Sequence, residues 1–172
     1  AADTVLGAVT LTLTTDDPAG PCDFASDDMV LTIKPLPVAS AGSDEEICEG
    51  TTVFNFSDQV TGAYGYNYSS VSWATTGGGT IVNGNTLTPS YEPVAGDVGT
   101  TLTFTLTVNG QGSCGVPATD DMDLVVTDAA TADAGADDEI CAGGTYTLAG
   151  SIGGSASTLT WTTSGTGTFD DD

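Results

Sequence analysis

Hydrophobic and polar residues alternate along several stretches of the chain with a period of two. Val9, Leu11 and Leu13 alternate with threonines, and residues 102–108 repeat the pattern. A period of two places successive side chains on opposite faces of a strand, so each stretch predicts a half-buried antiparallel strand with a Thr-rich solvent face. No window has the 3.6-residue period of an amphipathic helix, and the pattern therefore predicts an all-β protein.

The sequence also repeats over a longer distance. Residues 41–50 (AGSDEEICEG) match residues 134–143 (AGADDEICAG), so residue 134 corresponds to residue 41. Residues 27–29 (DDM) match residues 120–122, so residue 120 corresponds to residue 27. Both motifs have an offset of 93 residues. Two separate motifs with one offset indicate a tandem repeat.

This period divides the chain into three parts. Residues 1–36 form the C-terminal half of one repeat, residues 37–129 a complete repeat, and residues 130–172 the N-terminal half of a further repeat. Trp73, the counterpart of Trp161, lies on a strand in the first half of the complete repeat and is expected in its core. About seven short strands in roughly 90 residues around a core Trp predict tandem immunoglobulin-like antiparallel β-sandwiches.

Charge limits the partners of the chain. Twenty-four Asp and Glu residues stand against a single basic residue, Lys34, and the formal net charge is −23. Phosphate binding requires Lys and Arg to displace counterions, so no nucleic-acid partner is expected. No stretch approaches the roughly 20 apolar residues that span a bilayer, and no membrane insertion is expected.

The same composition argues against catalysis. With no His, no Arg and one Lys, the chain cannot form a Ser-His-Asp or Cys-His site or a phosphate clamp. Paired carboxylates could hydrolyse glycosides, but the acidic residues cluster at strand starts and repeat junctions. The sequence therefore predicts a protein that is not an enzyme.

Four short motifs occur in a fixed order along the chain: Ala-Gly-x-Asp-x-x-Ile-Cys-x-Gly, Trp-x-Thr followed by Thr or Ser, Tyr91-Glu92-Pro93, and a late Gly-x-Cys before an Asp-led strand. Together they resemble the PKD-like, immunoglobulin-type repeats of large Bacteroidota surface proteins. The resemblance covers essentially the whole chain. It implies a secreted, cell-surface location and a structural function in an adhesin stalk or extracellular filament. The alternative is an immunoglobulin-like module that binds a surface glycan or a protein.

The four cysteines are expected to form structural disulfides. The chain has no CxxC pair for zinc or redox chemistry, which favours an oxidising, extracellular compartment. Each repeat has one early and one late Cys, so we predict a disulfide between Cys48 and Cys114; the rival pairing joins Cys22 to Cys48. Cys22 and Cys141 are then expected to pair with equivalent cysteines of adjoining repeat halves.

Acidic residues concentrate where successive repeats meet. Calcium requires six to eight oxygen ligands and can stiffen a junction by drawing on both neighbours. The alternative is a solvated, self-repelling surface that keeps the protein soluble. No cofactor other than Ca²⁺ is expected, and its candidate ligands are Asp44, Glu45, Glu46, Asp128, Asp133, Asp137, Asp138 and Glu139.

Three further features suggest surface contacts. Asn67 begins an Asn-x-Ser glycosylation pattern, and Thr4 lies in a motif that resembles an O-glycan acceptor of Bacteroidota secreted proteins. Tyr64, Tyr66 and Tyr68 occupy a Gly- and Asn-containing loop that is enlarged in the complete repeat. Such loops either form adaptable contact surfaces or pack onto a sandwich.

The leading and trailing halves of the chain add up to almost one whole sandwich. Neither half is expected to bury its core alone, because each would leave strand edges and an apolar face open. Either the 172 residues are a window of a longer continuous stalk, which we favour, or the trailing half of one chain is completed by the leading half of the next. In both cases the expected partner is a further repeat of the same kind, arranged head to tail.

Overall fold

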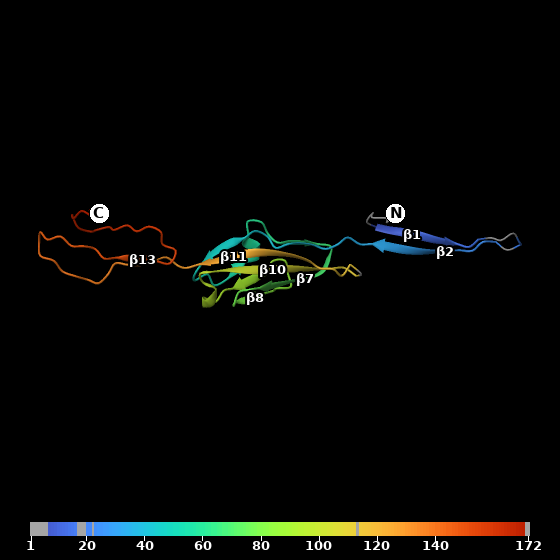
Figure 1. The fold of residues 1–172 in the computed structure, drawn as a ribbon, viewed down its shortest axis with the longest axis horizontal. Helices are drawn as coiled ribbons and strands as arrows, with labels where there is room; N and C mark the ends of the chain where they lie inside the picture. The colour runs from blue at the N-terminus through green and yellow to red at the C-terminus, as the bar shows by residue number, and fades with distance from the viewer. Residues whose placement is uncertain (1–6, 17–19, 22, 113, 171–172) are drawn as a thin grey trace.

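The structure is a computed structural model that describes residues 7–16, 20–21, 23–112 and 114–170. Three parts follow one another along the long axis of the molecule (Figure 1). The first is a hairpin of β1 (Gly7–Thr14) and β2 (Ser26–Ile33). A central sandwich follows, and the last part is an open segment with little regular structure.

The central sandwich is built on one four-stranded sheet. Its strands lie in the order β4 (Glu45–Cys48), β11 (Ala118–Thr127), β10 (Thr100–Gly110) and β7 (Tyr68–Thr75). Shorter strands form the second layer: β3 (Val38–Ser40) pairs with β6 (Tyr64–Tyr66), and β9 (Ser90–Glu92) lies between β5 (Phe54–Asn55) and β8 (Thr80–Val82). Two single turns of 3₁₀ helix, η1 (Phe56–Asp58) and η2 (Ala95–Asp97), connect these strands.

The core lies between the two layers, and period-two alternation explains which residues fill it. Along β10 the inward residues are buried and the intervening threonines are half-buried. Trp73 is buried, as expected, with its ring centroid 4.7 Å from that of Phe56 and its Nε1 donating to the Thr86 carbonyl at 3.0 Å. The buried hydrophobic residues are Ala41, Phe54, Phe56, Val71, Trp73, Tyr91, Leu102, Phe104, Leu106, Val108, Met122, Leu124 and Val126.

The expectation of an all-β, immunoglobulin-like fold is confirmed, with one correction to its strand directions. β4 pairs with β11 in parallel, whereas the sequence predicted antiparallel sheets. The chain leaves β3 in one layer and enters β4 in the other through Gly42, which has a φ of 97°. A Cβ at Gly42 would lie 2.5 Å from the Gln59 side chain, so the crossing requires glycine.

The trailing segment contains two short strands, β12 (Thr131–Asp133) and β13 (Ser151–Gly153). Their antiparallel pairing corresponds to that of β3 with β6 in the complete repeat. No strand forms at Trp161, the counterpart of Trp73 on β7, because the described trailing segment has no strand that pairs there as β10 pairs with β7. Across the described residues, no helix has the length and apolar character needed to cross a membrane.

Candidate functional site

The leading hairpin reproduces the central β10–β11 pair. Leu11 lies opposite Met29 in the hairpin, and Phe104, one period later, lies opposite Met122. Each residue pair in the register of β1 with β2 corresponds to a β10–β11 pair one repeat period later in the sequence. Strands β1 and β2 are therefore already paired as the last two strands of a sandwich.

The hairpin and the central β10–β11 pair differ in how exposed their apolar faces are. Phe104 and Met122 are 0% and 1% exposed, whereas Leu11 and Met29 are 47% and 57% exposed. Residues two apart on a strand, and residues directly opposite on its partner, share one face of the sheet. We call this uncovered surface the hairpin face; its exposed members are Leu11, Leu13, Met29 and Leu31.

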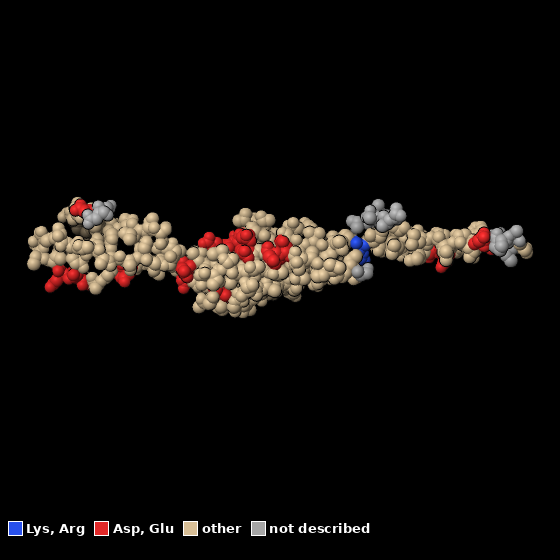
Figure 2. Space-filling model, in the orientation of Figure 1, with Lys and Arg blue, Asp and Glu red and all other residues tan. Residues whose placement is uncertain are grey.

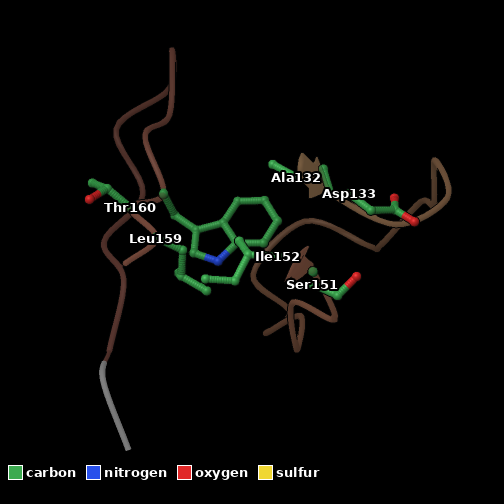
Figure 3. A pocket seen from close by; sticks show the side chains of 9 residues that line it. Ala132, Asp133, Ser151, Ile152, Leu159 and Thr160 are labelled. Carbon is green, nitrogen blue, oxygen red and sulfur yellow. The ribbon is translucent and has the colours of Figure 1, made fainter. Parts of the chain in front are cut away.

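The trailing segment also leaves apolar side chains uncovered, in this case around a hollow. A hollow of about 180 Å³ opens beside Trp161, and Ile152 and Leu159 both line it (Figure 3). In the complete repeat the strand of Trp73 is hydrogen-bonded along its edge to β10, with Trp73 opposite Leu106. The trailing hollow is lined by Ala132, Asp133, Ala134, Gly150, Ser151, Ile152, Leu159, Thr160 and Trp161, and within the described trailing segment no strand pairs with the chain at Trp161.

Acidic residues are distributed over all three parts of the molecule (Figure 2). In the acidic cluster that follows the first junction in the sequence, the carboxylates bind the sandwich itself: Asp44 accepts from the Asp123 backbone N–H at 2.9 Å and Glu45 from that of Val60 at 2.8 Å. Glu46 accepts from the Thr127 hydroxyl. These side chains therefore tie the edge strand β4 to β11 and to the segment after η1.

The carboxylates of the second acidic cluster accept from backbone groups of their own segment. Asp133 accepts from the Gly135 N–H and Asp138 from the Glu139 N–H, each at 2.8 Å, while Asp128 and Asp137 are exposed. Among the described residues, which include all eight candidate calcium ligands, no three acidic or cysteine side chains are grouped to hold a metal ion. The structure does not bring the predicted ligand set together.

The predicted disulfide between Cys48 and Cys114 is wrong, and both thiols are free. Cys48 ends β4 beside Thr127, whereas Cys114 follows the far end of β10. Strand β11 separates these ends by roughly 30 Å at 3.3 Å per residue, while a disulfide requires Cα atoms within about 7 Å. Cys141 is also free and exposed, and Cys22 lies outside the described residues.

The three tyrosines of the enlarged loop divide into two groups. Tyr64 and Tyr66, on β6, are 43% and 60% exposed, with ring centroids 5.5 Å apart. Tyr68 begins β7 and packs against the core. Exposed paired rings suit a contact surface, so only Tyr64 and Tyr66 retain that role as a hypothesis.

Of the two glycosylation candidates, Asn67 lies among the described residues. Asn67 is exposed at the turn between β6 and β7, has a φ of 57° and donates from its side-chain amide to the Leu36 carbonyl at 3.1 Å. Thr4 lies outside the described residues. Occupancy at both positions remains a prediction.

No family model matches the chain, and no curated protein matches it. One similar solved structure is a nucleoside hydrolase-related hypothetical protein from Saccharophagus degradans associated with carbohydrate metabolism, with 15% identity, a TM-score of 0.43, and coverage of 55% of this chain and 26% of that one. Another is the PKD domain from KIAA 1837 protein, with 19% identity, a TM-score of 0.40, and coverage of 59% and 92%. At these TM-scores neither similarity indicates a function.

The class of protein follows from the fold itself. The complete repeat is an immunoglobulin-like β-sandwich with a closed core. On one side it is joined to an uncovered hairpin, and on the other to a trailing segment with a hollow beside its Trp.

Proposed function

We propose that this chain is a non-enzymatic structural segment of a head-to-tail fibre, as in a cell-surface adhesin stalk or an extracellular filament. The observation that carries the proposal is the match between the uncovered hairpin face and the trailing hollow. The resemblance to PKD-like Bacteroidota surface repeats supports the extracellular setting. The completing hairpin comes from the continuing polypeptide in a stalk, or from a second copy in a filament.

The central repeat supplies the register of the proposed contact. Trp73 lies opposite Leu106 in the β7–β10 pair, so Trp161 would lie opposite Leu13 of the completing hairpin. On the other edge, Ile47 lies beside Val126 in the parallel pair, which places Ile140 beside Ile33. Both edges of the hairpin would then be hydrogen-bonded, which removes the open strand edges of an isolated hairpin.

The energetics favour a specific but reversible contact. Burying a fully exposed large apolar side chain stabilises by about 1.5–3 kcal/mol, so the four partly exposed members of the hairpin face contribute at most about 6–12 kcal/mol, whereas association costs about 4–15 kcal/mol. The gain and the cost are of similar size. Docking of the hairpin therefore depends on concentration unless the continuing chain or a covalent bond holds it.

The test is self-association of the 172-residue chain in reducing buffer, measured by sedimentation velocity over a concentration series. We expect species at multiples of 17.1 kDa. Leu11→Asp should abolish them, because it puts a charge into the contact at a side chain that is 47% exposed in the separate hairpin. Thr10→Asp, on the opposite face of the same strand, is the matched control and should associate normally. A wild-type chain that stays at 17.1 kDa at every soluble concentration contradicts the proposal.

The second candidate function is a module that binds a carbohydrate or protein, and the exposed Tyr64–Tyr66 pair favours it. Alanine at both positions is expected to change the free energy of unfolding by less than about 0.5 kcal/mol, whereas Tyr68→Ala should lower it by about 2 kcal/mol. Urea unfolding measures both effects. Equal losses in both variants would assign the exposed pair to packing.

A glycan array then addresses the binding function directly. Wild-type binding that the Tyr64/Tyr66 double alanine variant loses would favour the binding module over the fibre segment. Tyr146→Ala is the control, since Tyr146 is 48% exposed and lies in the trailing segment, away from this pair.

A further inference from the structure

Both cysteines of the complete repeat lie at its junctions with the flanking parts. At the C-terminal end Cys48 is followed by Glu49, whose carboxylate accepts from the Ala129 N–H at 3.0 Å. At the N-terminal end the Cys114 Sγ lies 3.6 Å from the Lys34 carbonyl oxygen, toward which its thiol points. Each thiol is therefore placed to meet a neighbouring repeat and not the other thiol of its own repeat.

The strand register identifies the partner. Cys48 lies directly beside Thr127 in the parallel β4–β11 pair. Cys141 lies one period after Cys48, and Lys34 lies one period before Thr127. The same pairing therefore places Cys141 of one copy beside Lys34 of the hairpin that completes it. Neighbouring strands are about 4.8 Å apart, so Cys141 would adjoin the residue whose carbonyl already contacts Cys114.

We propose that Cys141 of one copy and Cys114 of the next copy form a disulfide that covalently links the two along the fibre. This rests on the proposed function, because Cys141 approaches Lys34 of the next copy only when the hairpin docks. A disulfide requires Cα atoms about 4.4–6.8 Å apart, and the docked register brings Cys141 to within one strand spacing of Lys34, whose carbonyl oxygen contacts the Cys114 thiol. The same register relates Cys48 to Cys22 of the next copy, but Cys22 lies outside the described residues and the proposal does not depend on it.

Accessibility and local backbone geometry support the pairing. Cys141 is exposed and Cys114 is half-buried, so an oxidant can reach both thiols. The loop carrying Cys114 folds back over the end of β10, where a Cβ at Gly110 would collide with the Cys114 carbonyl oxygen and lie 3.3 Å from Pro37. Glycine at position 110 thus lets Cys114 sit beside the chain that enters from the preceding repeat.

The chemistry is thiol–disulfide exchange with a small-molecule disulfide. The Cys114 thiol loses its proton and attacks the oxidant, which releases one thiolate and leaves a mixed disulfide. The Cys141 thiolate then attacks the Cys114 sulfur and displaces the second thiolate. One S–S bond forms between copies, one is broken in the oxidant, and the two protons end on the two released thiols.

The experiment uses the full chain with Cys22→Ser and Cys48→Ser, so that only Cys114 and Cys141 remain. After oxidation in a buffer of oxidised and reduced glutathione, denaturing electrophoresis without reductant should show a ladder at multiples of 17.1 kDa. A reductant should collapse the ladder to the monomer. Adding Cys141→Ser should remove all species beyond a dimer, and adding Leu11→Asp should prevent the ladder because the hairpin no longer docks.

Peptide mapping with an Asp-specific protease identifies the linked residues. A peptide joining Cys114 to Cys141 in the ladder is expected, and the same linkage in a monomer would overturn the assignment to separate copies. Association in reducing buffer without any ladder on oxidation overturns the disulfide and leaves the proposed function intact. Absence of association under both conditions refutes both proposals.

Discussion

Phe104→Ala is expected to lower the free energy of unfolding of the central sandwich by about 4 kcal/mol. Phe104 is fully buried on β10, and its ring makes T-shaped contacts with Phe56 at 5.2 Å and with Tyr91 at 4.9 Å between centroids. The two contacts come from the second layer, so the ring joins the layers. Removing it loses the transfer free energy of the side chain and leaves a cavity between the sheets.

The repeat provides a matched control for this variant. Leu11 occupies the equivalent position in the hairpin, where it is 47% exposed, so Leu11→Ala should change the stability of the sandwich by less than about 0.5 kcal/mol. Urea unfolding followed by fluorescence measures both, in a Trp161→Phe background that leaves Trp73 as the only indole. Similar losses for the two variants would mean that the hairpin and the sandwich unfold as one unit.

Asp97→Asn is expected to lower the free energy of unfolding by about 3 kcal/mol. Asp97 is 3% exposed, and its carboxylate accepts from the Gly78 N–H at 2.8 Å, the Tyr91 hydroxyl at 2.7 Å and the Val94 N–H at 3.0 Å. An amide has one accepting oxygen and one donating nitrogen. The substitution therefore sets the NH₂ group of the introduced amide against donors and leaves at least one buried donor without an acceptor.

The same network predicts a dependence on pH. Burial by itself would raise the pKa of Asp97, but hydrogen bonds from Val94, Gly78, Tyr91 and Gly79 outweigh it and hold the pKa below its ordinary value of 3.8. Desolvation, followed by the hydrogen bond to Asp97, raises the pKa of Tyr91 to about 12, so its hydroxyl remains a donor at neutral pH.

The lowered pKa of Asp97 determines how the free energy of unfolding changes at acid pH. A carboxylate with a lowered folded-state pKa stabilises the fold above its unfolded pKa, and this contribution disappears as the pH falls through the folded value. The difference in unfolding free energy between wild type and Asp97→Asn should therefore shrink below about pH 4. Unfolding at neutral and acid pH measures it. Asp58→Asn, at an exposed carboxylate, is the control, and a difference that stays constant with pH would contradict the assignment.

Local patterns were enough to predict the long strands of the hairpin and of the complete repeat. Alternation at residues 102–108 predicted β10, and its repetition at residues 9–13 predicted β1, because a two-residue period depends only on which neighbours are apolar. The burial of Trp73 followed from its place in an immunoglobulin-like pattern. The exposure of the hairpin face followed as well, since half a sandwich lacks the layer that would cover it.

Other features depend on how strands far apart in the sequence are paired. Nothing in residues 45–48 indicates that β4 changes layers and runs parallel to β11, because a strand's direction is set by its neighbour and not by its own side chains. The acidic residues around Asp44 likewise accept from backbone groups that only the folded edge brings near them. A count of clustered carboxylates therefore predicted a cation site that the fold does not assemble among the residues described.

The cysteines show most clearly which features the sequence determined and which the tertiary structure determined. The sequence alone determined that each repeat has one early and one late Cys, because that is a matter of motif and period. Tertiary structure alone decided where they lie: the parallel pairing puts Cys48 at the C-terminal end of the sandwich, and the end of β10 puts Cys114 at the other. A disulfide requires a few ångströms between Cα atoms, and the length of a sheet separates these two.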